Sequence, residues 1–257
     1  MRSLLINADD LGFDEDTFSV TTRLMDAGVV RSATILLDHP LTDAAIAYAR
    51  ANAQRCSFGL HFNIAEGRPL GGKSRPTLTV ADGTFAPPIR QRLNALASRL
   101  APVDIAAEAE TQLGYLADHG VKPTHLDSHG HMHKFPAVLA ALKPVLARHR
   151  ITRIRLPQTL YDNQRFYSRF LDRFCMRPFR ADASFHTTDH FFNTRRHDDQ
   201  WFERFLRQLP AGSTELGVHP GSAEHWRRVE AAPLLDLSGG PTLPGDVRLI
   251  SYHEIGQ

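Results

Sequence analysis

The chain has 257 residues, of which 42% are hydrophobic, and its formal net charge is +2. This length suits one domain with a large core, which we expect to span 1–257. The balanced charge argues against a dedicated nucleic-acid binder, which would show a strong basic excess. No apolar run approaches the ~18 residues of a membrane span, so no transmembrane segment is expected. We find no signal peptide, and Cys56 and Cys175 form no CxxC pair, so a reducing, cytoplasmic setting is expected.

The N-terminal half alternates short apolar runs with amphipathic stretches. The apolar runs predict strands, the periodic stretches predict helices, and Gly28 and Gly120 are typical of helix ends. The strands are expected at 3–8, 32–37, 57–62 and 124–127, and the helices at 15–27, 42–53 and 104–119. Between them, the region 67–102 is rich in glycine, proline and polar residues, which indicates an inserted loop or cap with a short helix at 89–100.

The C-terminal half continues this alternation. It predicts helices at 135–148 and 165–174 and strands at 152–156, 213–218 and 247–252. Repeated alternation of strands and helices implies a parallel sheet, either open or closed into a barrel. In both architectures the active site lies at the C-terminal ends of the strands.

Polar residues stand at the ends of five predicted strands. They are Asp9 with Asp10, His61, the histidine-rich run 125–133, Arg155 and His219. Four histidines in nine residues would be an unusual choice for a plain loop, so the run favours a metal site. Two imidazoles and one carboxylate suit a catalytic divalent metal, because three protein ligands leave positions open for water and substrate. Of two adjacent aspartates, one could bind the metal and the other could take a proton from water.

Each of these residues also has an ordinary structural explanation. Asp9 and Asp10 are equally suited to cap the helix that follows them. A lone histidine such as His61 is more often packed or hydrogen-bonded than a ligand. His219, in a His-Pro-Gly turn, could be only a turn residue, and Arg155 could be a surface cation. The residue pattern alone leaves these alternatives open.

Not all four histidines of the run 125–133 can be metal ligands at once. We expect His125 and Asp127 to support the ligands or the fold. We expect His131 and His133 to face substrate or solvent.

Four sequence blocks occur in a characteristic order along the chain. They read Asn-Ala-Asp-Asp-Leu-Gly at 7–12, Gly-Leu-His at 59–61, Thr-His-Leu-Asp-Ser-His at 124–129 and His-Pro-Gly at 219–221. This combination resembles the YdjC-like carbohydrate deacetylases, which include chitooligosaccharide deacetylases and hopanoid-biosynthesis-associated deacetylases. The resemblance covers nearly the whole chain. It implies an α/β fold, a single distorted (β/α) barrel related to the polysaccharide deacetylases.

The resemblance also implies a metal site. Asp10, His61 and His129 match the metal ligands of the family, for a divalent ion that is Zn²⁺ or Mg²⁺. The run 125–133 then contributes one ligand, and the other two come from other strands. Relatives tend to carry a larger polar residue where this chain has Gly130, directly after the Asp-Ser-His block.

Three further residues match catalytic positions of the family. Asp9 matches the catalytic base, and His219 matches the histidine that is expected to act as general acid. Arg155 is similar to the arginine that orients the catalytic aspartate in the related deacetylases.

We therefore expect a metal-dependent hydrolase that removes an N-acetyl group from an amino sugar or an N-acetylated glycan or glycolipid. Its partner would be a small carbohydrate or a glycolipid, and the chain is compatible with a homodimer. One alternative is a metal-dependent phosphoesterase on a barrel, although such enzymes usually carry a His-x-His near the first strand, where this chain has Asp-Asp. The other alternative is a catalytically silent carbohydrate-binding barrel.

Overall fold

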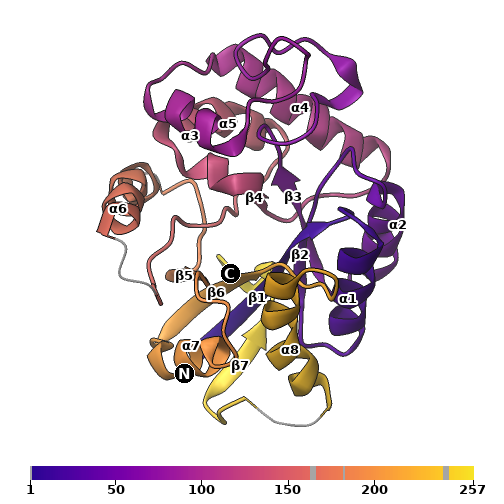
Figure 1. The fold of residues 1–257 in the computed structure, drawn as a ribbon, viewed down its shortest axis with the longest axis vertical. Coiled ribbons are helices and arrows are strands. Elements are labelled where there is room, and N and C mark those ends of the chain that lie inside the picture. Colours follow the sequence, from indigo (N-terminus) through magenta and orange to yellow (C-terminus); the bar gives the residue numbers. More distant parts are fainter. Residues whose placement is uncertain (1, 163–165, 182, 240–242) are drawn as a thin grey trace.

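The computed structural model describes residues 2–162, 166–181, 183–239 and 243–257, and it confirms the α/β fold (Figure 1). Seven strands in these residues form one parallel sheet in the order β4-β3-β2-β1-β6-β5, with β7 also paired to β1. The sheet curls into a half-barrel with helices around it (Figure 1). The strands are β1 (Arg2–Leu11), β2 (Ser32–Ile35), β3 (Ser57–Phe62), β4 (Leu126–Ser128), β5 (His190–Asn193), β6 (Gly212–Val218) and β7 (Val247–Ile250).

The strand β1 is the centre of the sheet because three strands pair with it. On one edge, β6 follows it from Arg2 to Ala8. On the other edge, β7 pairs with it up to Leu5 and β2 pairs with it from Asn7 onward. A strand that is covered on both faces is largely apolar, which explains why 3–8 was recognisable from the sequence.

The described residues contain eight α-helices. They are α1 (Glu15–Asp26), α2 (Thr42–Asn52), α3 (Pro88–Leu96), α4 (Pro102–Asp118), α5 (Pro136–Arg148), α6 (Phe166–Ala181), α7 (Trp201–Gln208) and α8 (His225–Gly239). The predicted helices at 15–27, 42–53, 104–119 and 135–148 are confirmed to within two residues at each end. None of the described helices combines the length and the apolar character that crossing a membrane would require.

The N-terminus of α1 shows whether Asp9 and Asp10 cap this helix or are free for another role. The side chain of Asp14 accepts a hydrogen bond from the backbone N–H of Thr17 at 2.8 Å and so caps this helix. Asp9 and Asp10 lie within β1 and do not cap α1. Their side chains therefore need another explanation.

The predicted strand at 152–156 is wrong as a continuous strand. The segment makes only single bridges, from Ile154 to Leu126 of β4 and from Arg153 to His186. Pro157 follows it, and a proline has no N–H with which to extend the hydrogen-bonded ladder. The segment still continues the curl of the sheet beyond β4.

Helix α6 is longer than predicted. It continues to Ala181, past the predicted end at Phe174, although Pro178 lies within it. The first residue of the predicted helix, Arg165, lies outside the described residues. The sequence analysis did not predict β5, α7 or α8.

The region 67–102 is packed onto the rest of the molecule. It contains α3 and the 3₁₀ turn η1 (Leu70–Gly72), and two further 3₁₀ turns in the chain are η2 (His129–Lys134) and η3 (Tyr252–Glu254). Leu78 and Phe85 are buried in the main hydrophobic core. The backbone N–H of Leu70 donates to the buried Glu108 of α4 at 3.0 Å. Gln91 of α3 donates to the carbonyl oxygens of Ile64 and Leu78, at 2.6 and 2.9 Å, and so fixes α3 to this region.

Candidate active site

A β-bulge at the end of β1 turns two consecutive carboxylates toward one pocket. Between Ala8 and Leu11, β1 uses one residue more than the paired β2 does. Asp10 has a φ of 61°, in the left-handed region that aspartate tolerates better than most residues. Successive strand residues normally point to opposite faces. Because of the bulge, Asp9 and Asp10 both line the pocket.

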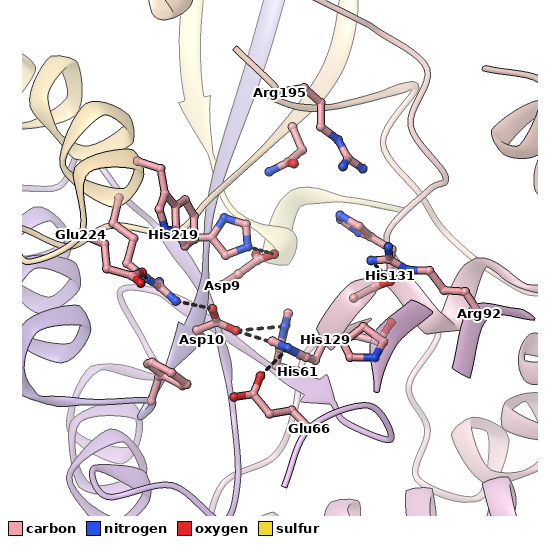
Figure 2. A pocket seen from close by; sticks show the side chains of 17 residues that line it. Asp9, Asp10, His61, Glu66, Arg92, His129, His131, Arg195, His219 and Glu224 are labelled. Carbon is pink, nitrogen blue, oxygen red and sulfur yellow. Dashed lines mark hydrogen bonds and ion pairs between the residues drawn. The ribbon is translucent and has the colours of Figure 1, made fainter. Parts of the chain in front are cut away.

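Three side chains from three strand ends converge beside this bulge (Figure 2). Asp10 comes from β1, His61 from β3 and His129 from η2, directly after β4. Asp10 Oδ1 lies 3.3 Å from His61 Nε2 and 3.3 Å from His129 Nδ1. Zinc–ligand bonds of ~2.0–2.1 Å in a tetrahedron would place neighbouring ligand atoms ~3.3 Å apart. The spacing of these donors therefore fits a divalent cation.

A second group of donors is already neutralised by an arginine. Asp9, His61 and Asp127 also lie close enough together to hold a cation. However, Arg155 Nη2 lies 2.6 Å from Asp9 Oδ1, and Arg155 Nη1 lies 2.8 Å from Asp127 Oδ2. The guanidinium is permanently charged and takes the place of a second cation. Within the described part of the chain, the pocket therefore offers one metal position.

The ring of His61 is oriented by contacts on the side away from Asp10. Its Nδ1 atom lies 2.7 Å from Asp127 Oδ1 and 3.1 Å from Thr34 Oγ1. Because the carboxylate accepts, we assign the proton to Nδ1, which leaves the lone pair of Nε2 directed at Asp10. Such carboxylate partners fix the orientation of metal-binding histidines. The structure thus places Asp127 directly behind a candidate ligand.

Two residues that the sequence analysis did not single out hold the other candidate ligands. Glu66 Oε2 lies 2.8 Å from His129 Nε2, and Arg227 Nη2 donates to Asp10 Oδ2 at 3.1 Å. Burial lowers the pKa of His129, but the hydrogen bonds to Asp10 and Glu66 outweigh it and raise the pKa to about 10. Glu66 and Arg227 therefore orient the donors from outside the candidate metal position.

Below the pocket lies a buried charged cluster, called the floor: Asp9, Asp127, Arg155 and Glu215. Arg155 donates to both oxygens of Asp9, at 2.6 and 2.7 Å, and its Nε donates to Glu215 at 2.8 Å. Burial works to raise the pKa of Asp9, but the charge of Arg155 outweighs it and holds the pKa well below its usual range. Burial raises the pKa of Glu215 to about 7 in spite of Arg155. Asp9 is therefore ionised at neutral pH and fixed in place.

His219 faces Asp9, with 3.7 Å between Nε2 and Asp9 Oδ2 (Figure 2). Behind it, Glu230 of α8 accepts from the backbone N–H of His219 at 2.7 Å and lies 3.3 Å from Nδ1. Burial lowers the pKa of His219, but Glu230, Asp9 and Asp10 outweigh it and raise the pKa to about 9. At neutral pH the imidazole is therefore protonated, with Nε2 on the side of Asp9.

His125 supports the fold beneath the site. It is buried, its ring stacks on Tyr252 with 3.7 Å between the centroids, and its Nε2 lies 3.1 Å from Asn7 Oδ1. A Cβ atom at Gly59 would come within 2.7 Å of this ring, so only glycine fits there. The supporting role expected for His125 agrees with these contacts.

His133 differs from the expectation. It is buried, with Nδ1 2.6 Å from Ser128 Oγ and Nε2 3.1 Å from the carbonyl oxygen of Arg155. Its ring contacts Ser128 and Arg155 and does not line the pocket, because the 3₁₀ turn η2 folds it back beneath the strand ends; a supporting position remains compatible with these contacts. His131 has a φ of 55° and does line the pocket.

The candidate ligands open into a cavity of about 400 Å³ (Figure 2). This volume lies within the ~300–1,000 Å³ that is usual for small-molecule sites. Five of the lining residues, each charged or aromatic, are called the rim: Glu66, Arg92, Arg195, Glu224 and Trp226. In the described residues, neither rim arginine forms a side-chain ion pair with a carboxylate. The rim therefore offers polar and aromatic groups that a ligand could contact.

The structure brings the predicted site residues together. Asp9, Asp10, His61, His129 and His219 all line the pocket, and Arg155 lies beneath it.

The sequence analysis missed Glu66, Arg227 and Glu230. Arg227 and Glu230 are three residues apart on α8 and so share one face of that helix. The available signal was this spacing directly after the His-Pro-Gly block. Glu66 lies in a loop, where no periodicity points to it.

Comparison with known proteins identifies relatives over the whole chain. The YdjC-like protein family matches residues 3–239. A carbohydrate deacetylase from Geobacillus stearothermophilus is 30% identical over 98% of this chain and 98% of its own length. A carbohydrate deacetylase from Brevibacillus brevis is 30% identical over 60% of this chain and 59% of its own length. Another from Clostridium beijerinckii is 27% identical over 66% and 68%.

One solved structure shares the fold. A putative cellobiose-phosphate cleavage protein from Enterococcus faecalis V583 superimposes with a TM-score of 0.70 and covers 98% of both chains. The two sequences are 18% identical, so the likeness concerns the fold alone. It supports the predicted barrel-like α/β architecture.

Proposed function

From the premise that this chain belongs to the YdjC-like protein family, we propose that it is a metal-dependent carbohydrate deacetylase. It removes an N-acetyl group from an amino sugar or from an N-acetylated glycan or glycolipid and releases acetate. The names of its curated relatives support this activity. The observation that carries the proposal is the placement of an ionised carboxylate, Asp9, and a protonated imidazole, His219, beside three donors with metal-ligand spacing.

Asp9 is the general base in this proposal. Amide hydrolysis requires a group that removes a proton from the attacking water. Asp9 is ionised, lines the pocket and is held by two hydrogen bonds from Arg155. Arg155 thereby acts as a positioning residue, because it fixes the plane of the Asp9 carboxylate. No serine or cysteine nucleophile is required.

His219 is the general acid. The amine that leaves a tetrahedral intermediate must be protonated, and the Nε2 atom of His219 lies 3.7 Å from Asp9 Oδ2, on the pocket side. Glu230 prevents rotation of the ring and keeps the pKa of His219 above its ordinary value. An amide bound between Asp9 and His219 would have a base on one side and an acid on the other.

Asp10, His61 and His129 would hold the metal ion. When bound there, a divalent cation polarises the acetamide carbonyl and lowers the pKa of a bound water. Two imidazoles with one carboxylate favour Zn²⁺, whereas Mg²⁺ prefers oxygen ligands and retains several waters. Metal analysis of the purified protein distinguishes these two ions.

The pocket suits a sugar in size and lining. Trp226 and Phe13 place flat aromatic surfaces on its wall, and the rim adds charged groups. Pro88 and Arg92 of α3 also line it, so we interpret the region 67–102 as a cap within a single domain. This cap would contact the parts of the substrate that surround the acetamide.

Acetate release tests the proposal. The panel runs from N-acetylglucosamine to its oligomers and N-acetylated glycolipids, with the protein assayed as purified, after chelation, and after Zn²⁺ or Mg²⁺ is returned. We expect release that chelation abolishes and one of the ions restores. No release from any substrate by metal-loaded protein would overturn the proposal. A phosphatase assay in parallel addresses the phosphoesterase hypothesis, which the single metal position does not favour.

A further inference from the structure

Two helices near the pocket expose large apolar side chains to solvent. Ile89, Leu93 and Leu96 on α3 and Phe170 and Phe174 on α6 have exposed fractions between 40% and 74%. Single exposed apolar residues are ordinary, but groups of them mark interaction surfaces.

On α6, the apolar residues share their face with arginines. Phe170 and Phe174 are four residues apart, and Arg173 and Arg177 lie beside them on the same side of the helix. All four are exposed. The Arg177 guanidinium lies 5.8 Å from the centroid of the Phe174 ring. One exposed side of α6 therefore offers both apolar surface and positive charge.

The face has charges of one sign. α3 contains no acidic residue, and the only one in α6, Asp172, is buried and pairs with Lys134 at 2.6 Å. In the described part of the chain, no carboxylate forms an ion pair with Arg173 or Arg177. The whole chain has a net charge of only +2, so this concentration of positive charge is local.

Helix α3 lines the pocket, and α6 contacts the 3₁₀ turn beside it. α3 and α6 each pack against η2, which carries His129 and His131, and both lie on the left side of the molecule in Figure 1. On α3, the pocket-lining Pro88 and Arg92 occupy the helix side next to the apolar residues. The apolar residues of α3 and α6 together with Arg173 and Arg177 are called the α3–α6 face.

We propose that the α3–α6 face docks on the surface of an anionic lipid bilayer. Its apolar side chains would enter the boundary between headgroups and acyl chains, while its arginines contact lipid phosphates. A second copy of this chain is a poorer occupant, since a two-fold dimer through this face would set arginines against arginines. Docking would hold the pocket mouth near the bilayer, where it could take an N-acetylated sugar carried on a lipid. That consequence rests on the proposed function, whereas the docking does not.

Sedimentation with vesicles tests the docking. The protein is mixed with vesicles of phosphatidylcholine alone or of equal parts phosphatidylglycerol and phosphatidylcholine, at low and at physiological salt. We expect binding to the anionic vesicles that weakens as salt is added. Leu93→Ser with Phe170→Ser should reduce binding by about tenfold or more, since each buried apolar side chain contributes substantially. Arg173→Gln with Arg177→Gln should also reduce it by about tenfold or more.

Two control variants make the test specific. Phe170→Leu keeps an apolar side chain on the face and should bind as the wild type does. Arg207→Gln removes an exposed arginine from α7, away from the face, and should also bind normally. Thermal unfolding establishes that each variant is folded.

Three results would overturn the proposal. The wild type could remain in the supernatant with both vesicle types, or the face variants could bind as well as the wild type. Alternatively, the wild type could be a dimer in sedimentation equilibrium that Leu93→Ser with Phe170→Ser converts to a monomer. Because vesicle binding is measured without substrate, failure of the docking and failure of the deacetylase proposal are separate outcomes.

Discussion

The floor and the rim of the pocket use charged side chains in opposite ways. In the floor, Arg155 is fully buried, and its donors contact the carboxylates of Asp9, Asp127 and Glu215. On the rim, the partly buried Arg92 donates to the backbone oxygen of Gly130 at 3.1 and 3.2 Å, while Arg195 is exposed and, among the described residues, forms no ion pair with a carboxylate. Buried charges with several partners cannot reorient, whereas exposed charges are screened and can meet a ligand. The floor thus fixes the geometry of the reaction, and the rim is suited to binding.

The largest effect on stability is expected from the floor. Arg155→Met leaves three carboxyl groups buried without their cation, and should lower the free energy of unfolding by about 3–5 kcal/mol. Arg148→Met removes an exposed partner of Glu110 and should cost about 1 kcal/mol or less. Urea unfolding of both variants measures the difference. Equal losses would show that the floor does not depend on its buried arginine.

A smaller effect, on metal affinity, is expected when the residue behind the candidate ligand His61 is changed. Asp127→Asn removes the carboxylate that orients His61, and should weaken metal affinity by about 10–100-fold. Competition with a metal chelator gives this ratio. Unchanged metal affinity would mean that Asp127 pairs with Arg155 but does not orient His61 for metal binding.

A shift of the pH profile is expected from Glu230→Gln. The general acid must be protonated, so activity should fall as the pH rises through the pKa of His219, which is about 9. Glu230 helps to raise that pKa, and the neutral amide should therefore move the alkaline fall in kcat to lower pH. If kcat fell at the same pH in both proteins, His219 would not be the general acid.

The smallest effect, a rise in KM, is expected from a substitution on the rim. Arg195→Ala removes a charge from the wall of the pocket and should raise KM by about tenfold or less, which corresponds to about 1.4 kcal/mol, with little change in kcat. Steady-state kinetics separate the two constants. A large fall in kcat with normal metal content would instead place Arg195 at the reacting atoms.

The sequence predicted the central parts of the fold better than its C-terminal part. Strands such as β1 and β3 are buried on both faces and therefore stand out as apolar runs. The segment 152–156 looked similar, but Pro157 limits it to single bridges. Helix α8 contains Pro233, and its amphipathic pattern was not recognised.

The residues of the site that stand at strand ends could be singled out from the sequence. Asp10, His61 and His129 lie at or just beyond the ends of strands, so the topology of the sheet brings them together, whereas their selection as the ligand set came from the family resemblance. Glu66 and Arg227 reach the same donors from a loop and from an unrecognised helix, and these contacts depend on tertiary packing that no local pattern encodes. The bulge that turns Asp9 and Asp10 toward one pocket was likewise visible only in the pairing of β1 with β2.

The central claim is that Asp9 removes a proton from water, and Asp9→Asn tests it most directly. The amide has nearly the same shape and lies outside the candidate ligand set, so the variant should keep its metal. Acetate release and metal content are measured on the same sample, with thermal unfolding as the control for folding. We predict full metal content with acetate release reduced by about 10²–10⁴-fold. Release near the wild-type rate from metal-loaded Asp9→Asn would contradict the account.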